Sequence, residues 1–193
     1  MDIWFFRNSR NKGVQHMKGK REQGFTLIEL LIVVAIISII AAIAVPGLLR
    51  ARMTGNETSA IASLRTTTSS QVSYSAACGN GAYATSYDIL ADAPGGRGQG
   101  FISAEFNRAA PVPKSGYNLT LAALTGAAAG PADCNTIATT TGFFATGVPV
   151  TLGTSGTRSF AVDTNMTIFQ NSAGAAIANT NPIVAGGTIT MVQ

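Results

Sequence analysis

The sequence predicts an α+β protein in which one long N-terminal helix packs on a small antiparallel sheet. Three observations lead to this prediction. An apolar run of 21 residues covers positions 25–45, and apolar residues then recur every three or four positions over 46–77. Short runs with β-like composition follow from residue 101 onward. The 193 residues suit one domain.

The apolar run 25–45 is long enough to cross a membrane. At about 1.5 Å of rise per residue it would form roughly 32 Å of helix, and the core of a bilayer is about 30 Å thick. Thr26, Glu29 and Ser38 are the polar residues in the run. Soluble domains rarely contain a surface helix that is apolar on every side, so the run predicts insertion into a membrane.

Residues 1–24, before the run, are basic. They hold six of the 13 basic residues and two of the nine acidic ones, which leaves seven of each for the rest of the chain. The net charge of +4 therefore belongs to this segment. Lysine and arginine beside an apolar helix hold that end in the cytoplasm, so no nucleic-acid partner is expected. Met1 and Met17 are both possible starts.

The junction of the two segments reads Gly-Phe-Thr-Leu-Ile-Glu, from Gly24 to Glu29. It resembles the signal of type IV pilins and of the pseudopilins of type II secretion, closely over 18–51. The resemblance implies that a prepilin peptidase removes residues 1–24 by cutting after Gly24 and methylates the new amine of Phe25. The rival prediction is ordinary signal-peptide cleavage near residues 42–44.

Glu29 is by this resemblance the residue that directs assembly. An acidic side chain at the centre of a bilayer costs about 2.5–3.5 kcal/mol. A helix that serves only as an anchor gains nothing from such a residue. The cationic amine on Phe25 of a neighbouring copy would supply a partner. Breaking one half of a buried ion pair costs about 3–5 kcal/mol, enough to fix the axial register of a helix bundle. In the alternative, Glu29 reaches the lipid headgroups and has no assembly role.

The second half of the helix, 46–77, is predicted to be amphipathic, with a kink at Pro46 because proline removes a helical hydrogen bond. Its apolar stripe would cover the sheet through Ile61, Leu64 and Val72. We expect its charged residues to lie largely outside that stripe: Arg50, Arg52, Glu57 and Arg65.

Residues 78–193 are predicted to form a globular α+β head, which gives a ladle-like shape with the helix as its handle. Asp163-Thr164-Asn165 reads as a hairpin turn that would bring Ile168 opposite Phe160 and Val162. The predicted strands are 116–121, 142–150, 157–162 and 166–170, with possible edge strands at 183–184 and 188–192.

The chain has two cysteines, Cys78 and Cys134. The head is expected outside the cytoplasm, where thiols oxidise, so a disulfide between them is favoured over two separate buried thiols. It would stabilise the head by about 4 kcal/mol on the chain-entropy model.

The sequence offers few candidate catalytic residues, and no enzyme activity, cofactor or metal site is expected. The single histidine, His16, lies in the leader, so the mature chain lacks a Ser-His-Asp arrangement or a histidine metal site. The scattered acids are expected to be solvated turn residues: Asp88, Asp92, Glu105, Asp133 and Asp163.

The predicted function is that of a structural subunit of a type IV pilus. The subunit would span the inner membrane once with its N-terminus in the cytoplasm. It would then polymerise with copies of itself through the N-terminal helix into an extracellular filament. A prepilin peptidase and an assembly platform are the other expected partners. The alternatives are a pseudopilin in a periplasmic filament and a membrane-tethered domain that never polymerises.

Overall fold

The computed structural model describes residues 24–192, so the predicted leader, including Met1, Met17 and His16, lies outside the described residues. The longest element is α1 (Leu27–Ala77), a helix of 51 residues that contains Pro46. The chain divides into a first unit that ends at Ala42 and a second, Ile43–Gln193. Helical backbone continues through Pro46, and the kink there stays a prediction.

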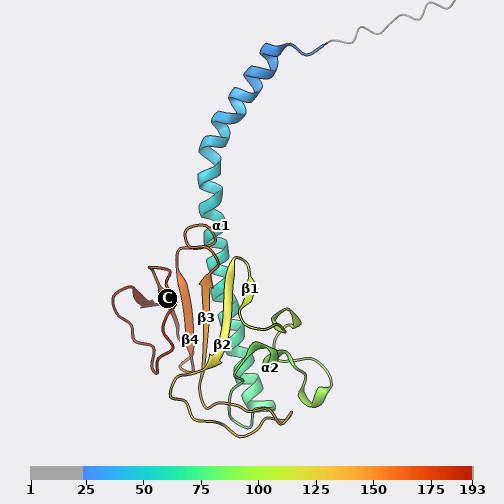
Figure 1. Cartoon of the computed structure of the whole chain (residues 1–193), viewed down its shortest axis with the longest axis vertical. Helices are drawn as coiled ribbons and strands as arrows, with labels where there is room; N and C mark the ends of the chain where they lie inside the picture. The colour runs from blue at the N-terminus through green and yellow to red at the C-terminus, as the bar shows by residue number, and fades with distance from the viewer. Residues whose placement is uncertain (1–23, 193) are drawn as a thin grey trace, which may run out of the picture. The chain divides into compact units, whose positions relative to one another are not determined.

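The second unit contains a six-stranded antiparallel sheet whose strands are adjacent in chain order. Figure 1 shows β1 to β4 side by side in front of the second half of α1. The strands are β1 (Val112–Lys114), β2 (Tyr117–Ala123), β3 (Phe143–Pro149), β4 (Ser159–Asp163), β5 (Ile168–Asn171) and β6 (Ile189–Met191). Short helical segments precede them: α2 (Tyr87–Ala91) and the 3₁₀ turns η1 (Pro94–Gly96) and η2 (Ala104–Phe106).

The predicted α+β class is confirmed, and so is the hairpin between β4 and β5. The turn closes where Met166 N–H donates to the Asp163 carbonyl at 2.9 Å. The register places Val162 directly opposite Ile168. The short strand β1 is additional to the prediction. It lies at the edge of the sheet and contains Pro113, a residue that makes a strand hard to recognise in sequence.

The main core lies between the second half of α1 and one face of the sheet. Leu64 is fully buried there, as predicted, and Ile61 packs at the margin. The prediction for Val72 is wrong, because this side chain is 44% exposed. At about 100° per residue, Gln71 rather than Val72 follows Leu64 on the same side of the helix, and Gln71 is the residue that is buried.

Glycine in β3 allows the helix to approach the sheet closely. A Cβ atom built on Gly147 would lie 3.8 Å from the Ala60 Cβ of α1 and 3.2 Å from the Leu119 Cδ2 of β2. A larger side chain at this position would separate the two layers. The small residues therefore set the distance at which Leu64 reaches the core.

The opposite face of the sheet is also covered. Phe144 and Ala161 point to this face and pack with Ile177 and Ile183 of the C-terminal segment. The predicted edge strand at 183–184 is wrong, because Ile183 is buried against the sheet and has no strand conformation. The Ile183 N–H donates to the Asp163 carboxylate at 3.4 Å, which fastens the segment to the β4–β5 turn.

The predicted disulfide between Cys78 and Cys134 is confirmed, with Cα atoms 4.8 Å apart. It joins the residue that follows α1 to the loop before β3. The Cys134 N–H also donates to the Cys78 carbonyl at 2.9 Å. The end of α1 is therefore tied to the head through both side chain and backbone.

Candidate functional site

The start of α1 is a capping box formed by Thr26 and Glu29. The Thr26 hydroxyl accepts the Glu29 N–H at 3.3 Å, and the Glu29 Oε2 accepts the Thr26 N–H at 2.9 Å. The Thr26 hydroxyl also donates to the same Oε2 at 2.7 Å. These contacts satisfy N–H groups that the first turn of a helix leaves unpaired. They also explain why α1 begins at Leu27, two residues later than the predicted start at Phe25.

The capping box leaves part of the Glu29 carboxylate available. All its hydrogen bonds fall on Oε2, and within residues 24–192 its Oε1 accepts none. A carboxylate has about four lone-pair sites, so it can hold the helix start and still receive a further donor. The spacing Thr-x-x-Glu before an apolar run is the sequence signal for this cap, which our sequence analysis missed.

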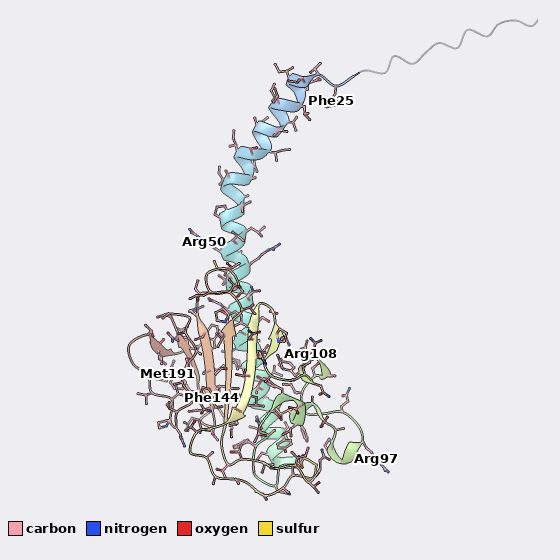
Figure 2. The ribbon with its side chains drawn as sticks, viewed as in Figure 1. Phe25, Arg50, Arg97, Arg108, Phe144 and Met191 are labelled. Atoms are coloured by element: carbon pink, nitrogen blue, oxygen red, sulfur yellow. A yellow bond between two sulfur atoms is a disulfide. The ribbon has the colours of Figure 1, made fainter. Side chains whose placement is uncertain are left out.

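The residues of the predicted cleavage junction lie in non-helical backbone before α1. Both Gly24 and Phe25 are exposed, and the Phe25 side chain is 80% exposed. Figure 2 shows Phe25 at the start of the helix. A peptidase could therefore reach the bond between them without unwinding the helix.

The first half of α1 exposes large apolar side chains along its whole length. Thirteen such side chains, from Leu27 to Val45, are at least 47% exposed, and so is Phe25 just before the helix. Ser38 donates its hydroxyl to the Val34 carbonyl at 2.7 Å, so its polar group is satisfied within the helix. By length and composition this helix could cross a membrane. An exposed apolar surface of this extent marks a site of contact with a membrane or with other proteins.

A second acid of α1, Glu57, forms an ion pair in the head. We expected Glu57 on the solvent side, but it is 5% exposed. Its Oε2 accepts Arg158 Nη2 at 2.6 Å and Nε at 2.9 Å, while its Oε1 accepts the Thr157 N–H at 2.8 Å. Burial alone would raise the pKa of Glu57, but the hydrogen bonds from Arg158 and Thr157 outweigh it and lower the pKa. The pair fixes α1 to the start of β4.

Two of the acids expected to be solvated are also buried. Asp163 is fully buried in the β4–β5 turn, and Asp133 is 5% exposed beside the disulfide. Asp133 accepts the Tyr74 hydroxyl at 2.7 Å and the Ile137 N–H at 2.7 Å. Burial, and then the Asp133 contact, raise the pKa of Tyr74. These carboxylates are occupied by structural hydrogen bonds. No group of three metal-ligating side chains occurs within residues 24–192.

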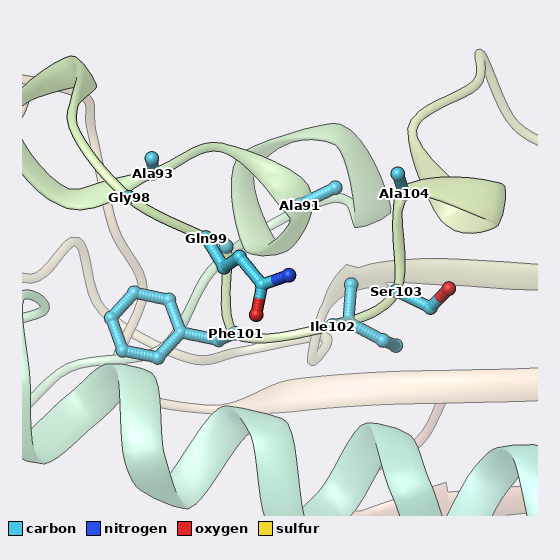
Figure 3. Close-up of a pocket in the computed structure, with 9 residues that line it drawn as sticks. Ala91, Ala93, Gly98, Gln99, Phe101, Ile102, Ser103 and Ala104 are labelled. Carbon is cyan, nitrogen blue, oxygen red and sulfur yellow. The ribbon is translucent and has the colours of Figure 1, made fainter.

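A shallow cavity of about 630 Å³ lies beside α2 (Figure 3). Its polar side chains come from Gln99 and Ser103, and none of its lining residues is titratable. The lining residues are Ala91, Ala93, Gly98, Gln99, Gly100, Phe101, Ile102, Ser103 and Ala104. This composition offers no acid, base or nucleophile pair for catalysis.

Comparison with known proteins identifies the region around the start of α1. The model of the prokaryotic N-terminal methylation motif matches residues 19–45. The type IV wide pilus major component PilA4 of Thermus thermophilus is 59% identical to the chain over 39 residues. This match covers 20% of the chain and 30% of that relative. No solved structure matches the chain.

The motif, the apolar helix and the capped glutamate occur together at one end of the chain, and the head is an α+β fold on the same helix. Over this N-terminal segment the chain carries the prokaryotic N-terminal methylation motif and is similar to a type IV pilus component.

Proposed function

We propose that the chain is a structural subunit of a type IV pilus. The observation that carries the proposal is the exposed apolar helix with Glu29 near its start. In a membrane this surface contacts lipid, and in a filament it contacts the same helix of other copies. The similarity to a pilus component over 39 residues supports this choice.

Maturation by a prepilin peptidase is the first step of the proposal. The enzyme cuts between Gly24 and Phe25 and methylates the Phe25 amine. The exposure and non-helical backbone of both residues support access to this bond. Sequencing of the mature protein should begin at N-methyl-Phe25. A start near residue 44, or an intact leader, would contradict this step.

The membrane-bound subunit spans the inner membrane once, with its leader in the cytoplasm and its head outside. The basic residues before Phe25 support this orientation, and the disulfide supports an oxidising compartment for the head. From this position an assembly platform adds the subunit to the filament.

Glu29 sets the axial register of that filament. Its Oε2 is engaged within its own chain, and its Oε1 is available for the Phe25 amine of a neighbouring copy. Apolar side chains slide past one another at little cost, whereas an unpaired carboxylate in hydrocarbon is unfavourable. The charge pair therefore selects one axial position among many similar ones.

The decisive experiment separates the charge of Glu29 from its capping role. Glutamine can replace glutamate in a capping box, so Glu29→Gln keeps the cap and removes the charge. We expect this variant to stay in the membrane and to lose most surface filaments in electron micrographs of sheared material. Ser38→Ala, which removes another polar group from the same span, should assemble normally. Normal filament yield from Glu29→Gln would refute the register argument.

A pseudopilin is the second candidate, because the same N-terminal motif occurs in both classes. Its filament would be short and periplasmic and would act in secretion. Sheared surface material from cells with and without this chain distinguishes the two. Filaments that depend on the chain support the pilus, and a secretion defect without such filaments supports the pseudopilin.

A further inference from the structure

The segment of α1 between the apolar run and the head contains two exposed arginines, Arg50 and Arg52. Neither forms an ion pair in the described part of the chain, where the two salt bridges are Lys114–Glu105 and Arg158–Glu57. The first side-chain hydrogen bond between α1 and the head comes later, where Asn56 Nδ2 of α1 donates to the Ser155 carbonyl at 2.9 Å. Within the described residues, the two cations are therefore open to a partner of opposite charge.

The position of these arginines along the helix matches the surface of a membrane. Arg50 and Arg52 follow Val45 by five and seven residues, or about 8 and 10 Å along the axis. The headgroup layer extends roughly 5–8 Å beyond the hydrocarbon on each side. Side chains on a helix lean toward its N-terminus, which brings both guanidinium groups back toward Val45 and into that layer.

Their position around the helix indicates the kind of partner. Residues two positions apart in an α-helix are rotated by about 200° around its axis, so Arg50 and Arg52 project to nearly opposite sides. Figure 2 shows the Arg50 side chain projecting away from α1. A single docked protein would meet one of the two arginines. A headgroup layer surrounds the helix and meets both.

We propose that Arg50 and Arg52 bind the phosphates of phospholipid headgroups at the outer surface of the inner membrane. The planar guanidinium group matches a phosphate with two parallel hydrogen bonds. Arginines on both sides of the helix hold the end of the span at the headgroup level. This inference rests on the membrane insertion of the proposed function and is independent of polymerisation.

Solid-state NMR tests the contact directly. The full chain, labelled with ¹³C at the arginine Cζ, is placed in vesicles of phosphatidylethanolamine and phosphatidylglycerol. Dephasing of the Cζ signal by lipid ³¹P then reports arginine–phosphate contact. We expect Arg50→Gln/Arg52→Gln to lose the dephased signal of two arginines. The matched control Arg97→Gln/Arg108→Gln removes two exposed arginines of the head and should keep that signal.

Because all samples carry the same leader arginines, the difference between the two double variants isolates the proposed contact. Equal phosphate dephasing in both would overturn the inference. Magnetisation transfer from lipid acyl chains to the isoleucine methyls of the apolar run is measured in the same samples. If acyl-chain magnetisation reaches these methyls but Arg50 and Arg52 contribute nothing to the phosphate dephasing, the inference is overturned and the proposed function stands. Absence of transfer overturns both.

Discussion

The two halves of α1 share one continuous helix and contrast in what they expose. In the first half, up to Val45, large apolar side chains are exposed on every side. In the second half, polar residues are buried on one side: Glu57, Ser63, Thr67, Ser70 and Gln71. Hydropathy alone would predict buried apolar side chains in the first half and exposed polar side chains in the second. What decides burial is the surface that packs against each half.

Each buried polar group in the second half has a defined partner. Gln71 shows the principle most clearly, because its amide pairs with the backbone of Ala84 in both directions. Its Nε2 donates to the Ala84 carbonyl at 2.8 Å, and its Oε1 accepts the Ala84 N–H at 2.9 Å. A buried polar group with its hydrogen bonds satisfied is tolerated. In the first half, Ser38 bonds within the helix itself, and the exposed apolar side chains suit contact with lipid or other helices.

The largest expected effect comes from removing a core side chain of the second half. Leu64→Ala leaves a cavity under the sheet and should lower the free energy of unfolding of the head by about 3 kcal/mol. Ile36→Ala, on the exposed first half, should leave it unchanged. Tyr83, Tyr87 and Tyr117 lie in the head, and Tyr74 near the end of α1 is buried in the same core. The tyrosine signal in near-ultraviolet circular dichroism during urea unfolding in detergent therefore reports on the packing of the head. Equal losses from both variants would remove the contrast between the halves.

A smaller loss is expected from breaking the ion pair that attaches the second half to β4. Arg158→Ala leaves the Glu57 carboxylate buried without its cation. The free energy of unfolding should fall by about 2–3 kcal/mol, below the range for fully buried pairs because the Arg158 side chain is 37% exposed. Arg97→Ala, at an exposed arginine with no ion pair within residues 24–192, should change it by less than about 0.5 kcal/mol. The same urea titration measures both, and indistinguishable midpoints would mean that the pair is not what fastens α1.

The smallest effect is a pH dependence with the same origin. The pKa of Glu57 is lowered from its ordinary value of 4.5 by its hydrogen bonds to Arg158 and Thr157. As the pH falls, the unfolded chain therefore binds a proton at Glu57 before the folded chain does. The contribution of Glu57 to stability is complete above its ordinary pKa and is lost as the pH falls through the lowered one.

Thermal unfolding of the full chain between about pH 6 and pH 3 measures this dependence. The melting temperature of the wild type should fall more steeply than that of Glu57→Gln, which has no carboxylate to titrate. All other side chains are the same in both proteins, so the comparison isolates Glu57. Parallel curves would show that Glu57 has the same pKa in the folded and unfolded chain.

Features that depend on neighbours in sequence could be predicted. The hairpin at Asp163 was recognisable because strand and turn residues follow one another there. The N-terminal motif was recognisable because its residues are consecutive. Val72, by contrast, was assigned to the core because it is apolar and fits the three-to-four-residue spacing of the predicted stripe. In the folded chain it lies on the side of the helix that faces away from the sheet. Glu57 was assigned to solvent because its partner Arg158 lies about 100 residues later in the chain.

The sequence by itself determined the long helix, the apolar character of its first half, the α+β class and the family motif, since each is local in the chain. The tertiary structure alone decided which polar residues are buried and how the C-terminal segment covers the second face of the sheet. It also showed that Arg50 and Arg52 have no partner in the described chain. Those outcomes depend on contacts between distant segments, because burial and charge pairing are properties of the folded surface rather than of neighbouring residues.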